Sequence, residues 1–530
     1  MKMNIKNHIV FPLLLLLITA CNDAWDEHYK QNTGGRSDQN LYQIIRSDAR
    51  LSTFAAMLES TGYDTLLSKP VTHTVWAPVN SRVLDSIAAL NDAAKNREIV
   101  MNHISRFAYN TSGLNASNIF MLNSKFVNFK RQADGYVFGG QTLISDRSGI
   151  AAANGILHAI STPVPYMLNL WEFILKTPGL DSLRTFLDAN SVYAFDPKAS
   201  VEIGTNEFGQ SVYDSVITFS NPLLEKIGYL HLEDSVYTVL LPDNKAWRSA
   251  YQLISSKYKT QIKDGGTSMQ RQLTREAIVN NLVFRAQEAD QQDSIVSTNG
   301  NIFRNPARLF TGATKNTLSN GTAWITDSLR FTPAESWQQP IIVEAENSDY
   351  GRSFQFANLF VRSGLGTPLS SQVSETRYLL IESTTVTATQ PAAVTFPIPN
   401  VLSGRYRIFC VFLPSSIVSE TDRRPYKMRF YLTHTNSSGT VIENAPIGSA
   451  NQLLATNRTA HIFTSTGAAL SKMFVTEIEF PFSNIYTPGA AATTIRTRLR
   501  VENAVTTVEE IQNRGDRKMR IDYIILEPVQ

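Results

Sequence analysis

Cysteine is nearly absent from this chain of 530 residues, which contains only Cys21 and Cys410. Two cysteines exclude a fold held together by a network of disulfides. Cys410 lies in an apolar run of strand length, where we expect it to act as a small buried hydrophobic residue. The fold must therefore depend on hydrophobic cores.

An excess of charge of either sign is also missing. Lys and Arg number 49 against 46 Asp and Glu, and charged residues make up 18% of the chain, below the usual quarter. Nucleic-acid binding needs a basic surface field, which this balance does not supply. We expect no nucleic-acid partner.

Catalytic and cofactor motifs are missing as well. The sequence has no His-Glu-x-x-His, no Gly-x-Ser-x-Gly, no Cys-x-x-Cys and no phosphate loop ending in Gly-Lys. Its eight histidines lack the spacing of metal ligands. Glu344 and Glu346 form a carboxylate pair of the kind that glycosidases use, but nothing marks either as a proton donor. We expect a protein that is not an enzyme.

The apolar run near the N-terminus, Ile9–Ile18, is too short to span a bilayer as a folded helix. It follows Lys2 and Lys6 and ends in small residues before Cys21, which is the pattern of a secretory signal. Cys21 resembles the lipid acceptor of a bacterial lipoprotein. The acidic stretch Asn22–Glu27 is similar to the tag that sends some Gram-negative lipoproteins to the outer face of the outer membrane. The resemblance implies a lipid anchor; an ordinary signal peptide with an incidental cysteine is the alternative.

Residues 73–87 recur at 237–251. In each copy a β-rich run meets a proline, an asparagine (Asn80 or Asn244) and then apolar residues at helical spacing, which predicts a strand, an N-cap and an amphipathic helix. Three further pairs of segments recur in the same order: Asn40–Ile45 with Asn169–Ile174, Arg97–His103 with Arg275–Asn281, and Asn154–Ile160 with Asn320–Thr326. The offset between copies grows from 129 to 164, which predicts an insertion of about 35 residues near 193–233. The stretch 257–274 contains Gly265 and Gly266 and is expected to be a loop.

These markers resemble the fasciclin domain, a compact α+β adhesion module. In the first copy the resemblance rests on Thr74–Asn80, Val100–Ile104 and Asn154–Ile160. The second copy is diverged and has lost both histidines of the first, His103 and His158. We expect these histidines to be hydrogen-bonded core residues and not catalytic groups.

Beyond Trp337–Pro340 the chain consists of short β-rich runs separated by Gly, Pro, Asn and Ser, with no long helix. Seven runs have the length of a strand: Tyr378–Glu382, Val394–Ile398, Tyr406–Leu413, Met428–Leu432, Met473–Phe480, Thr497–Glu502 and Met519–Leu526. This pattern predicts an all-β sandwich or jelly roll. The irregular stretches 414–426, 436–470 and 482–494 are expected to be loops.

The two ends of this β-region carry carboxylates. Ile342–Glu346 opens it and Arg520–Leu526 closes it. The pair resembles carbohydrate-binding β-sandwich modules, in which an early Glu-Ala-Glu and a late Asp hold a structural calcium. The resemblance implies calcium ligands at Glu344, Glu346 and Asp522, which pairing of the first and last strands would bring together. Solvated carboxylates without a metal are the alternative.

A tripeptide of Asp, then Ser or Thr, then an aliphatic residue occurs seven times, always within the repeats. It resembles the O-glycan acceptor of exported proteins in some Gram-negative gut bacteria; helix-start and turn chemistry is the alternative. The implied acceptors are Thr65, Ser86, Ser182, Ser215, Ser235, Ser294 and Ser328.

We therefore expect an α+β chain with two tandem fasciclin-like domains followed by an all-β sandwich of jelly-roll or galactose-binding-like type. The expected boundaries are 1–21 for the lipoprotein signal peptide, 22–39 for a tether, 40–165 and 166–335 for the two fasciclin-like domains, and 341–530 for the sandwich.

The expected function is binding or adhesion at the cell surface, with the protein anchored in the outer membrane and capturing an extracellular glycan or polymer beside a nutrient importer. The alternative is a structural subunit that binds an outer-membrane protein and has no ligand of its own. Exposed aromatic residues in the sandwich loops, such as Tyr350 or Tyr486, would favour glycan binding, whereas a continuous apolar patch would favour a protein partner.

Overall fold

The structure is a computed structural model that describes residues 38–529, except for 90–91, 113–115, 134, 197, 199–200, 206–210, 215–216, 286–287 and 386–389. Cys21, the signal peptide and residues 22–37 of the tether lie outside the described residues. The chain divides into two compact units. The first contains the described residues up to Glu172 together with His231–Ser235 and Leu318–Asn320, and the second contains the rest.

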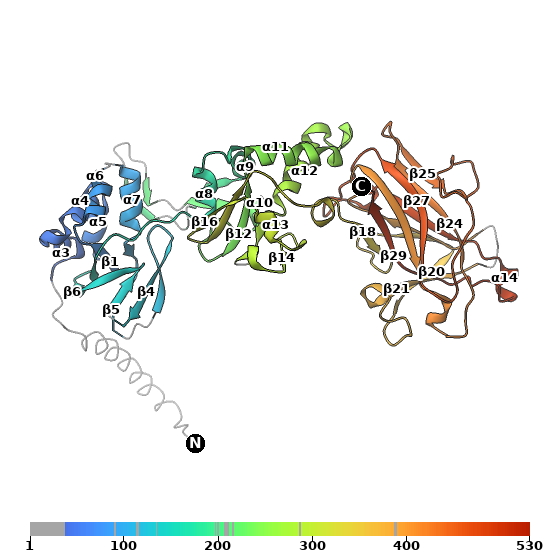
Figure 1. Cartoon of the computed structure of the whole chain (residues 1–530), viewed down its shortest axis with the longest axis horizontal. Coiled ribbons are helices and arrows are strands. Elements are labelled where there is room, and N and C mark those ends of the chain that lie inside the picture. Colours follow the sequence, from blue (N-terminus) through green and yellow to red (C-terminus); the bar gives the residue numbers. More distant parts are fainter. Residues whose placement is uncertain are drawn as a thin grey trace, which may run out of the picture. The chain divides into compact units, whose positions relative to one another are not determined.

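The first repeat is a mixed sheet with helices against it (Figure 1). Its elements are α3 (Leu41–Ser47), α4 (Ser52–Thr61), α5 (Tyr63–Ser68), β1 (His73–Pro78), α6 (Arg82–Ala89), α7 (Ala93–Met101), β2 (Ile104–Ser105), β3 (Ala116–Phe120), β4 (Phe126–Gln132), β5 (Gly135–Phe138), β6 (Gln141–Ala152) and β7 (Gly155–Ile160). The strand order is β2-β1-β7-β6-β5-β4-β3, with β1 and β7 parallel. β1 lies inside the sheet and is buried along its whole length, which explains its unbroken β-rich sequence.

The second repeat has the same central arrangement. Its elements are α8 (Leu170–Lys176), α9 (Asp181–Asp188), β8 (Val192–Phe195), β9 (Val201–Thr205), β10 (Ser211–Asp214), β11 (Ile217–Ser220), α10 (Pro222–Ile227), β12 (Tyr237–Pro242), α11 (Asn244–Ser255), α12 (Gly266–Val279), β13 (Val283–Phe284), β14 (Ser294–Val296), β15 (Ile302–Arg304), α13 (Ala307–Phe310), β16 (Thr314–Leu318) and β17 (Gly321–Thr326). The order β13-β12-β17-β16 matches β2-β1-β7-β6. Val75 pairs with Leu157 in the first copy, and Val239 pairs with Ala323 at the equivalent place in the second.

Two predictions for the second repeat have different outcomes. The expected insertion near 193–233 contains β8–β11, which form two separate two-stranded ribbons. The expected loop at 257–274 is wrong in its second half, because α12 starts at Gly266. Gly265 and Gly266 both have positive φ, and the residues after them up to Val279 include neither Gly nor Pro, so the helix continues without a break.

The predicted N-caps at Asn80 and Asn244 are also wrong, because each asparagine caps a helix of the preceding segment. The Asn80 side-chain oxygen accepts the backbone N–H of Thr53 in α4 at 3.0 Å. Asn244 accepts the N–H of Ser182 in α9 at 2.9 Å, and Asp243 caps α11. The other repeated asparagines act in the same way. The side chain of Asn154 accepts the backbone N–H of Leu41, and the side chain of Asn320 accepts the backbone N–H of Leu170, both at 2.8 Å.

The C-terminal region is a sandwich of two six-stranded sheets. Its strands are β18 (Ile341–Glu344), β19 (Ser353–Gln355), β20 (Ala357–Ser363), β21 (Arg377–Ser383), β22 (Ala393–Pro397), β23 (Gly404–Phe412), β24 (Lys427–Thr435), β25 (Val441–Pro446), β26 (Phe463–Thr464), β27 (Ser471–Phe480), β28 (Arg498–Asn503) and β29 (Met519–Pro528), and its short helix is α14 (Thr507–Ile511). One sheet has the order β20-β21-β29-β23-β27 with β18 paired to β29, and the other β19-β22-β28-β24-β25 with β26 paired to β24. All seven predicted strands are present, and the stretch 436–470, expected to be a loop, contains β25 and β26.

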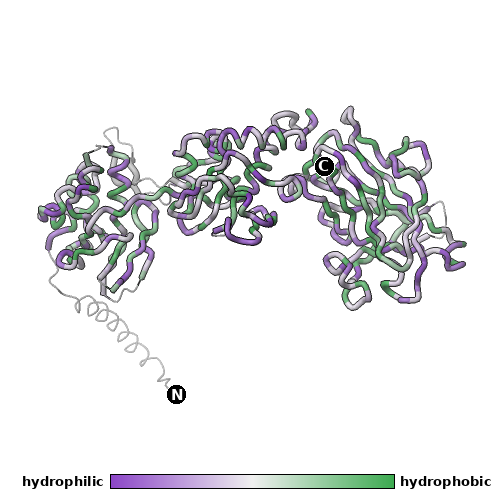
Figure 2. The backbone as a smooth tube through the Cα atoms, viewed as in Figure 1, coloured by the Kyte–Doolittle hydropathy of each residue, from purple (hydrophilic) through white to green (hydrophobic). Residues whose placement is uncertain are grey.

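Hydrophobic residues follow the strands of the sandwich and alternate there with hydrophilic ones (Figure 2). The inward-facing set forms one continuous core that includes Cys410, which is fully buried as predicted. Within the described part of the chain, no helix is long and apolar enough to cross a bilayer.

Candidate functional site

The first and last strands of the sandwich pair, as predicted, and bring their carboxylates together. β18 lies antiparallel to β29, with Glu344 opposite Tyr523, and the backbone N–H of Ala345 donates to the carbonyl of Asp522 at 2.9 Å. Asp522 is fully buried. Pairing of two strands that lie far apart in the sequence therefore creates the acidic site.

A third segment, the turn η6 (Ser374–Thr376) between β20 and β21, closes over these residues. The Ser374 N–H donates to both carboxylate oxygens of Asp522 at 3.2 Å, and its hydroxyl donates to Glu344 Oε1 at 2.7 Å. The next two residues, Glu375 and Thr376, have positive φ values of 44° and 62°. Such backbone conformations are unfavourable for residues other than Gly and persist only when the surroundings enforce them.

The electrostatics of this site favour either a proton or a cation. Burial, and then the neighbouring carboxylates of Glu344 and Glu346, raise the pKa of Asp522 to about 7, although the Ser374 N–H opposes the shift. Burial is also the main cause that raises the pKa of Glu344 and Glu346, and Glu375 adds to both shifts. Uncompensated carboxylates in one partly buried place repel each other, so a bound cation would stabilise their ionised forms.

The residues present are chemically suited to calcium. Glu344 Oε2 and Glu346 Oε2 are buried and have no hydrogen-bond partner, and hard carboxylate oxygens are the ligands that calcium prefers. Within the described residues, however, no group of three or more His, Cys, Asp or Glu side chains is arranged at metal-binding geometry. The calcium site at Glu344, Glu346 and Asp522 stays a prediction.

Two tyrosines from separate sandwich loops meet close to the start of the domain. Tyr350 follows β18 and Tyr486 lies between β27 and β28; their rings are 5.3 Å apart and nearly perpendicular. The Tyr486 N–H donates to the Asn400 side chain at 3.1 Å, and its hydroxyl donates to the carbonyl of Ala490 at 2.9 Å. Both tyrosines are half-buried.

The histidines of the first repeat are buried structural residues. His103 Nδ1 donates to the Ile99 carbonyl at 2.6 Å, and its Nε2 accepts the Val164 N–H at 2.9 Å. His158 Nε2 donates to the Tyr109 carbonyl at 2.9 Å. Burial lowers the pKa of both to about 4, so both are neutral at pH 7 and act as hydrogen-bonding core groups.

The predicted glycan acceptors do not gather at one place. Ser215 lies outside the described residues. Four of the others are exposed, namely Thr65, Ser86, Ser294 and Ser328, and two are half-buried, namely Ser182 and Ser235. The hydroxyl of Ser86 donates to the Arg82 carbonyl at 2.7 Å, as helix chemistry alone would produce. Glycosylation stays a prediction, as does acylation of Cys21.

Residues 49–164 match the family model described as Fasciclin domain. This segment is the first repeat, and the second has the same central strand order and register. The chain contains two fasciclin-like domains followed by an all-β sandwich. No curated protein matches the chain.

Several solved structures are similar to parts of the chain. A FAS1 domain pair from the insect cell adhesion molecule Fasciclin I is 13% identical, covering 54% of this chain and 98% of that one, with a TM-score of 0.20. A family 35 carbohydrate-binding module from Clostridium thermocellum is 14% identical over 36% of this chain and 99% of its own, with a TM-score of 0.20. A xylan-binding domain from CBM 22 is 13% identical; the match covers 35% of this chain and 92% of that domain, with a TM-score of 0.19. The architecture described above rests on the strand order and register of this chain itself.

Proposed function

We propose that this protein is a non-enzymatic binding protein of the bacterial cell surface. Acylated Cys21 anchors it in the outer membrane, and the sandwich captures an extracellular glycan or polymer beside a nutrient importer. The two fasciclin-like domains act as a scaffold between anchor and sandwich, because their repeated asparagines and histidines are used in caps and core hydrogen bonds. Calcium held by Glu344, Glu346 and Asp522 would join the first sandwich strand to the last.

The tyrosine pair Tyr350–Tyr486 is the observation that carries this proposal. Aromatic rings offer an apolar face against which the C–H groups of a sugar pack, and the tyrosine hydroxyl adds a polar edge. The two loops that present the rings lie against each other, since a Cβ added at Gly351 would be 3.7 Å from Ala492 Cβ. The two rings therefore form one surface that both loops hold in place.

A structural subunit without a ligand is the second candidate, and the ribbon strand β8 favours it. All four of its residues are exposed, including Val192, Tyr193 and Phe195. Exposed apolar side chains on a two-stranded ribbon are suited to contact with another protein.

One experiment on intact cells tests anchor and ligand together. Cells expressing the full chain are incubated with fluorescein-labelled plant polysaccharides (xylan, galactan and glucomannan) and host mucin glycans, and labelling is measured by flow cytometry. We expect at least one polysaccharide to label the cells. Tyr350→Ala with Tyr486→Ala should reduce labelling at least about tenfold, as for loss of a binding hot spot. Cys21→Ala should remove the protein itself from the surface.

Protease added to the same cells separates loss of glycan binding from loss of the protein at the cell surface. The tyrosine variant should be trimmed like the wild type, and Tyr193→Ala, which removes an exposed tyrosine outside the sandwich, should leave labelling unchanged. Full protection of the wild-type protein contradicts surface exposure. Labelling that is insensitive to the tyrosines contradicts the assigned surface. Absence of any labelling, with an outer-membrane protein co-purifying with the wild type but not with Tyr193→Ala, supports the second candidate instead.

A further inference from the structure

The outer face of one sandwich sheet carries a row of apolar side chains that crosses four strands. The register places Ile342 of β18 opposite Ile525 of β29, Ile525 opposite Phe409 of β23, and Phe409 opposite Phe474 of β27. The residues before and after each of these four pack in the core of the sandwich. Because side chains alternate along a strand, the four point away from the core. The rings of Phe409 and Phe474 are 5.5 Å apart.

Two residues of this row are open to solvent to an extent that is unusual for apolar side chains. Ile342 is 54% exposed and Phe474 is 37% exposed. The Lys472 Nζ lies over the Phe409 ring, 4.5 Å from its centroid. Contiguous exposed apolar surface marks places where a protein binds a partner. The row therefore indicates a docking surface, and the residues beside it identify the partner.

Charged residues continue the same face along β23 and β27. Arg405 lies opposite Glu479, and Arg407 lies opposite Glu477. These four side chains also alternate with core residues of their strands, so they point the same way as the apolar row. All four are partly or largely exposed. At two matched positions, β23 thus presents a cation where β27 presents an anion.

This pattern is complementary to itself. A two-fold axis above the sheet, parallel to the strands and midway between β23 and β27, places β23 of one copy over β27 of the other without a shift along the strands. Arg405 and Arg407 then face Glu479 and Glu477 of the second copy, and Phe409 faces Phe474. Such a contact uses the same surface on both subunits, as two-fold dimers do, and opposite charges fix its register. Sheets commonly pack face to face with their strands nearly aligned.

The size of the face is sufficient for a reversible dimer. The strands β29, β23 and β27 have nine or ten residues each. With about 4.8 Å between strands and about 3.4 Å per residue, they and the short β18 form a face on the order of 500 Å². Two such faces bury on the order of 1,000 Å², the lower limit of a specific interface. We therefore expect association in the micromolar range and not an obligate dimer.

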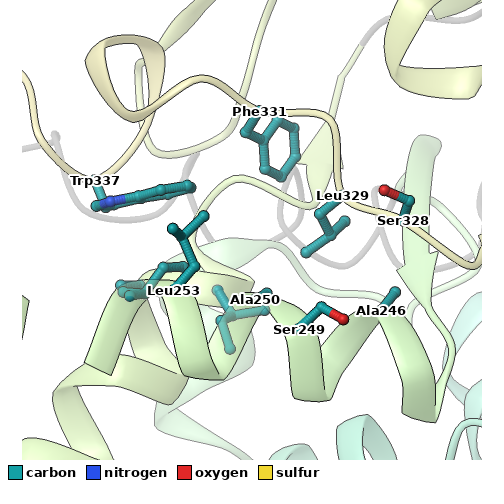
Figure 3. Close-up of a pocket in the computed structure, with 11 residues that line it drawn as sticks. Ala246, Ser249, Ala250, Leu253, Ser328, Leu329, Phe331 and Trp337 are labelled. Carbon is teal, nitrogen blue, oxygen red and sulfur yellow. The ribbon is translucent and has the colours of Figure 1, made fainter. Parts of the chain in front are cut away.

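The apolar hollow on α11 offers no comparable pattern. Figure 3 shows Phe331 and Trp337 above Leu253 and Ala250 of this hollow, which has a volume of about 100 Å³. None of its described lining residues is charged. Nothing in this lining selects one partner over another, whereas the charges beside the apolar row of the sandwich do.

We propose that the outer face formed by β18, β29, β23 and β27 is a homodimer interface, in which two copies of this chain pack face to face across a two-fold axis parallel to the strands. The inference goes beyond the proposed function and holds whether or not a glycan binds. Tyr350 and Tyr486 lie in loops outside this face, so each dimer carries two copies of the proposed glycan-binding surface.

The test is sedimentation velocity of the full chain carrying Cys21→Ala, which prevents acylation and removes the need for detergent. We expect a reversible dimer with a dissociation constant on the order of 10 μM. Arg405→Glu with Arg407→Glu makes all four charged positions acidic, and Glu477→Arg with Glu479→Arg makes all four basic. Each double variant should remain monomeric up to about 100 μM, because like charges then face each other.

Mixing the two double variants should restore dimers at about the wild-type affinity, because each acidic strand then faces a basic one. Phe474→Ala should weaken the wild-type dimer at least about tenfold by removing a central aromatic contact. Arg46→Glu with Lys245→Glu is the matched control, since it gives the same change in net charge as the Arg405 and Arg407 variant at two exposed positions outside the sandwich. It should change the dissociation constant less than about threefold. Thermal melting verifies that each variant is folded.

Three results would overturn the interface. A wild-type chain that is monomeric at about 100 μM has no such dimer. A dimer that neither double variant weakens forms through another surface. Loss of dimers in both double variants without recovery in their mixture contradicts the two-fold arrangement, whereas recovery in the mixture supports it.

Discussion

Replacing Gly155 by alanine is expected to unfold the first fasciclin-like domain. Gly155 begins β7 with a φ of 152°, and an added Cβ would lie 1.9 Å from the carbonyl oxygen of His73 in β1. The clash is with backbone inside a parallel strand pair, so no side-chain rotation relieves it. Gly321 meets the same condition, with an added Cβ 2.0 Å from the Tyr237 carbonyl oxygen. We expect each substitution to cost at least about 4 kcal/mol, the range of the most severe backbone and packing defects.

Hydrogen–deuterium exchange of the full chain measures this effect domain by domain, because one unfolding free energy is not defined for a multidomain chain. Peptides covering β1 and β7 should lose protection in Gly155→Ala, while peptides of the sandwich keep theirs. Gly62→Ala is the control, since Gly62 has a φ of 78° but nothing within 4 Å of the added Cβ. Its cost should be about 1 kcal/mol. Wild-type protection of β7 in Gly155→Ala would contradict the assigned strand pairing.

Calcium is expected to stabilise the sandwich, and more strongly at high pH than at low pH. The pKa of Asp522 rises from 3.8 to about 7 on folding, so the protonated carboxyl favours the folded state. That stability is fully present below pH 3.8 and is lost as pH rises through 7. The shift corresponds to about 4 kcal/mol, or about 10 °C in melting temperature. In EDTA the melting temperature of the sandwich should therefore fall between pH 4 and pH 7.

Adding calcium at pH 8 should restore most of this loss, because the cation replaces the proton at the carboxylates, and at pH 4 it should have little effect. Asp522→Asn should remove the calcium effect and the part of the pH dependence that Asp522 contributes, while Glu344 and Glu346, whose pKa values burial also raises, keep their part. Glu527→Gln is the matched control on the same strand, since Glu527 forms a partly exposed ion pair with Lys472. Differential scanning calorimetry of the full chain gives the melting temperature. A melting temperature at pH 8 that is the same in EDTA as in calcium would contradict a calcium site.

The strands of the sandwich were predictable because their runs of apolar and β-branched residues mark each strand without knowledge of its partner. The roles of the repeated asparagines could not be predicted from the sequence. Asn80 lies before a helix in the sequence, as an N-cap does, but its side chain reaches Thr53, and only the fold brings them together. The start of α12 was missed because Gly265 and Gly266 indicate a turn equally well whether a loop or a helix follows.

The candidate site was predictable in part, through a resemblance. Glu344 and Asp522 stood out because the two ends of the β-region resemble carbohydrate-binding β-sandwich modules, in which an early Glu-Ala-Glu and a late Asp hold calcium. Ser374 donates to both, yet nothing around it in the sequence indicates a special turn, since the positive φ values that follow fall on Glu and Thr.

Hydrogen–deuterium exchange of the full chain, with and without the polysaccharide that labels intact cells, tests the central claim most directly. The claim is that the sandwich binds the glycan, while the first fasciclin-like domain is scaffold. Saturating polysaccharide should protect peptides around Tyr350 and Tyr486 and leave residues 40–165 unchanged. Protection confined to residues 40–165 would contradict the account.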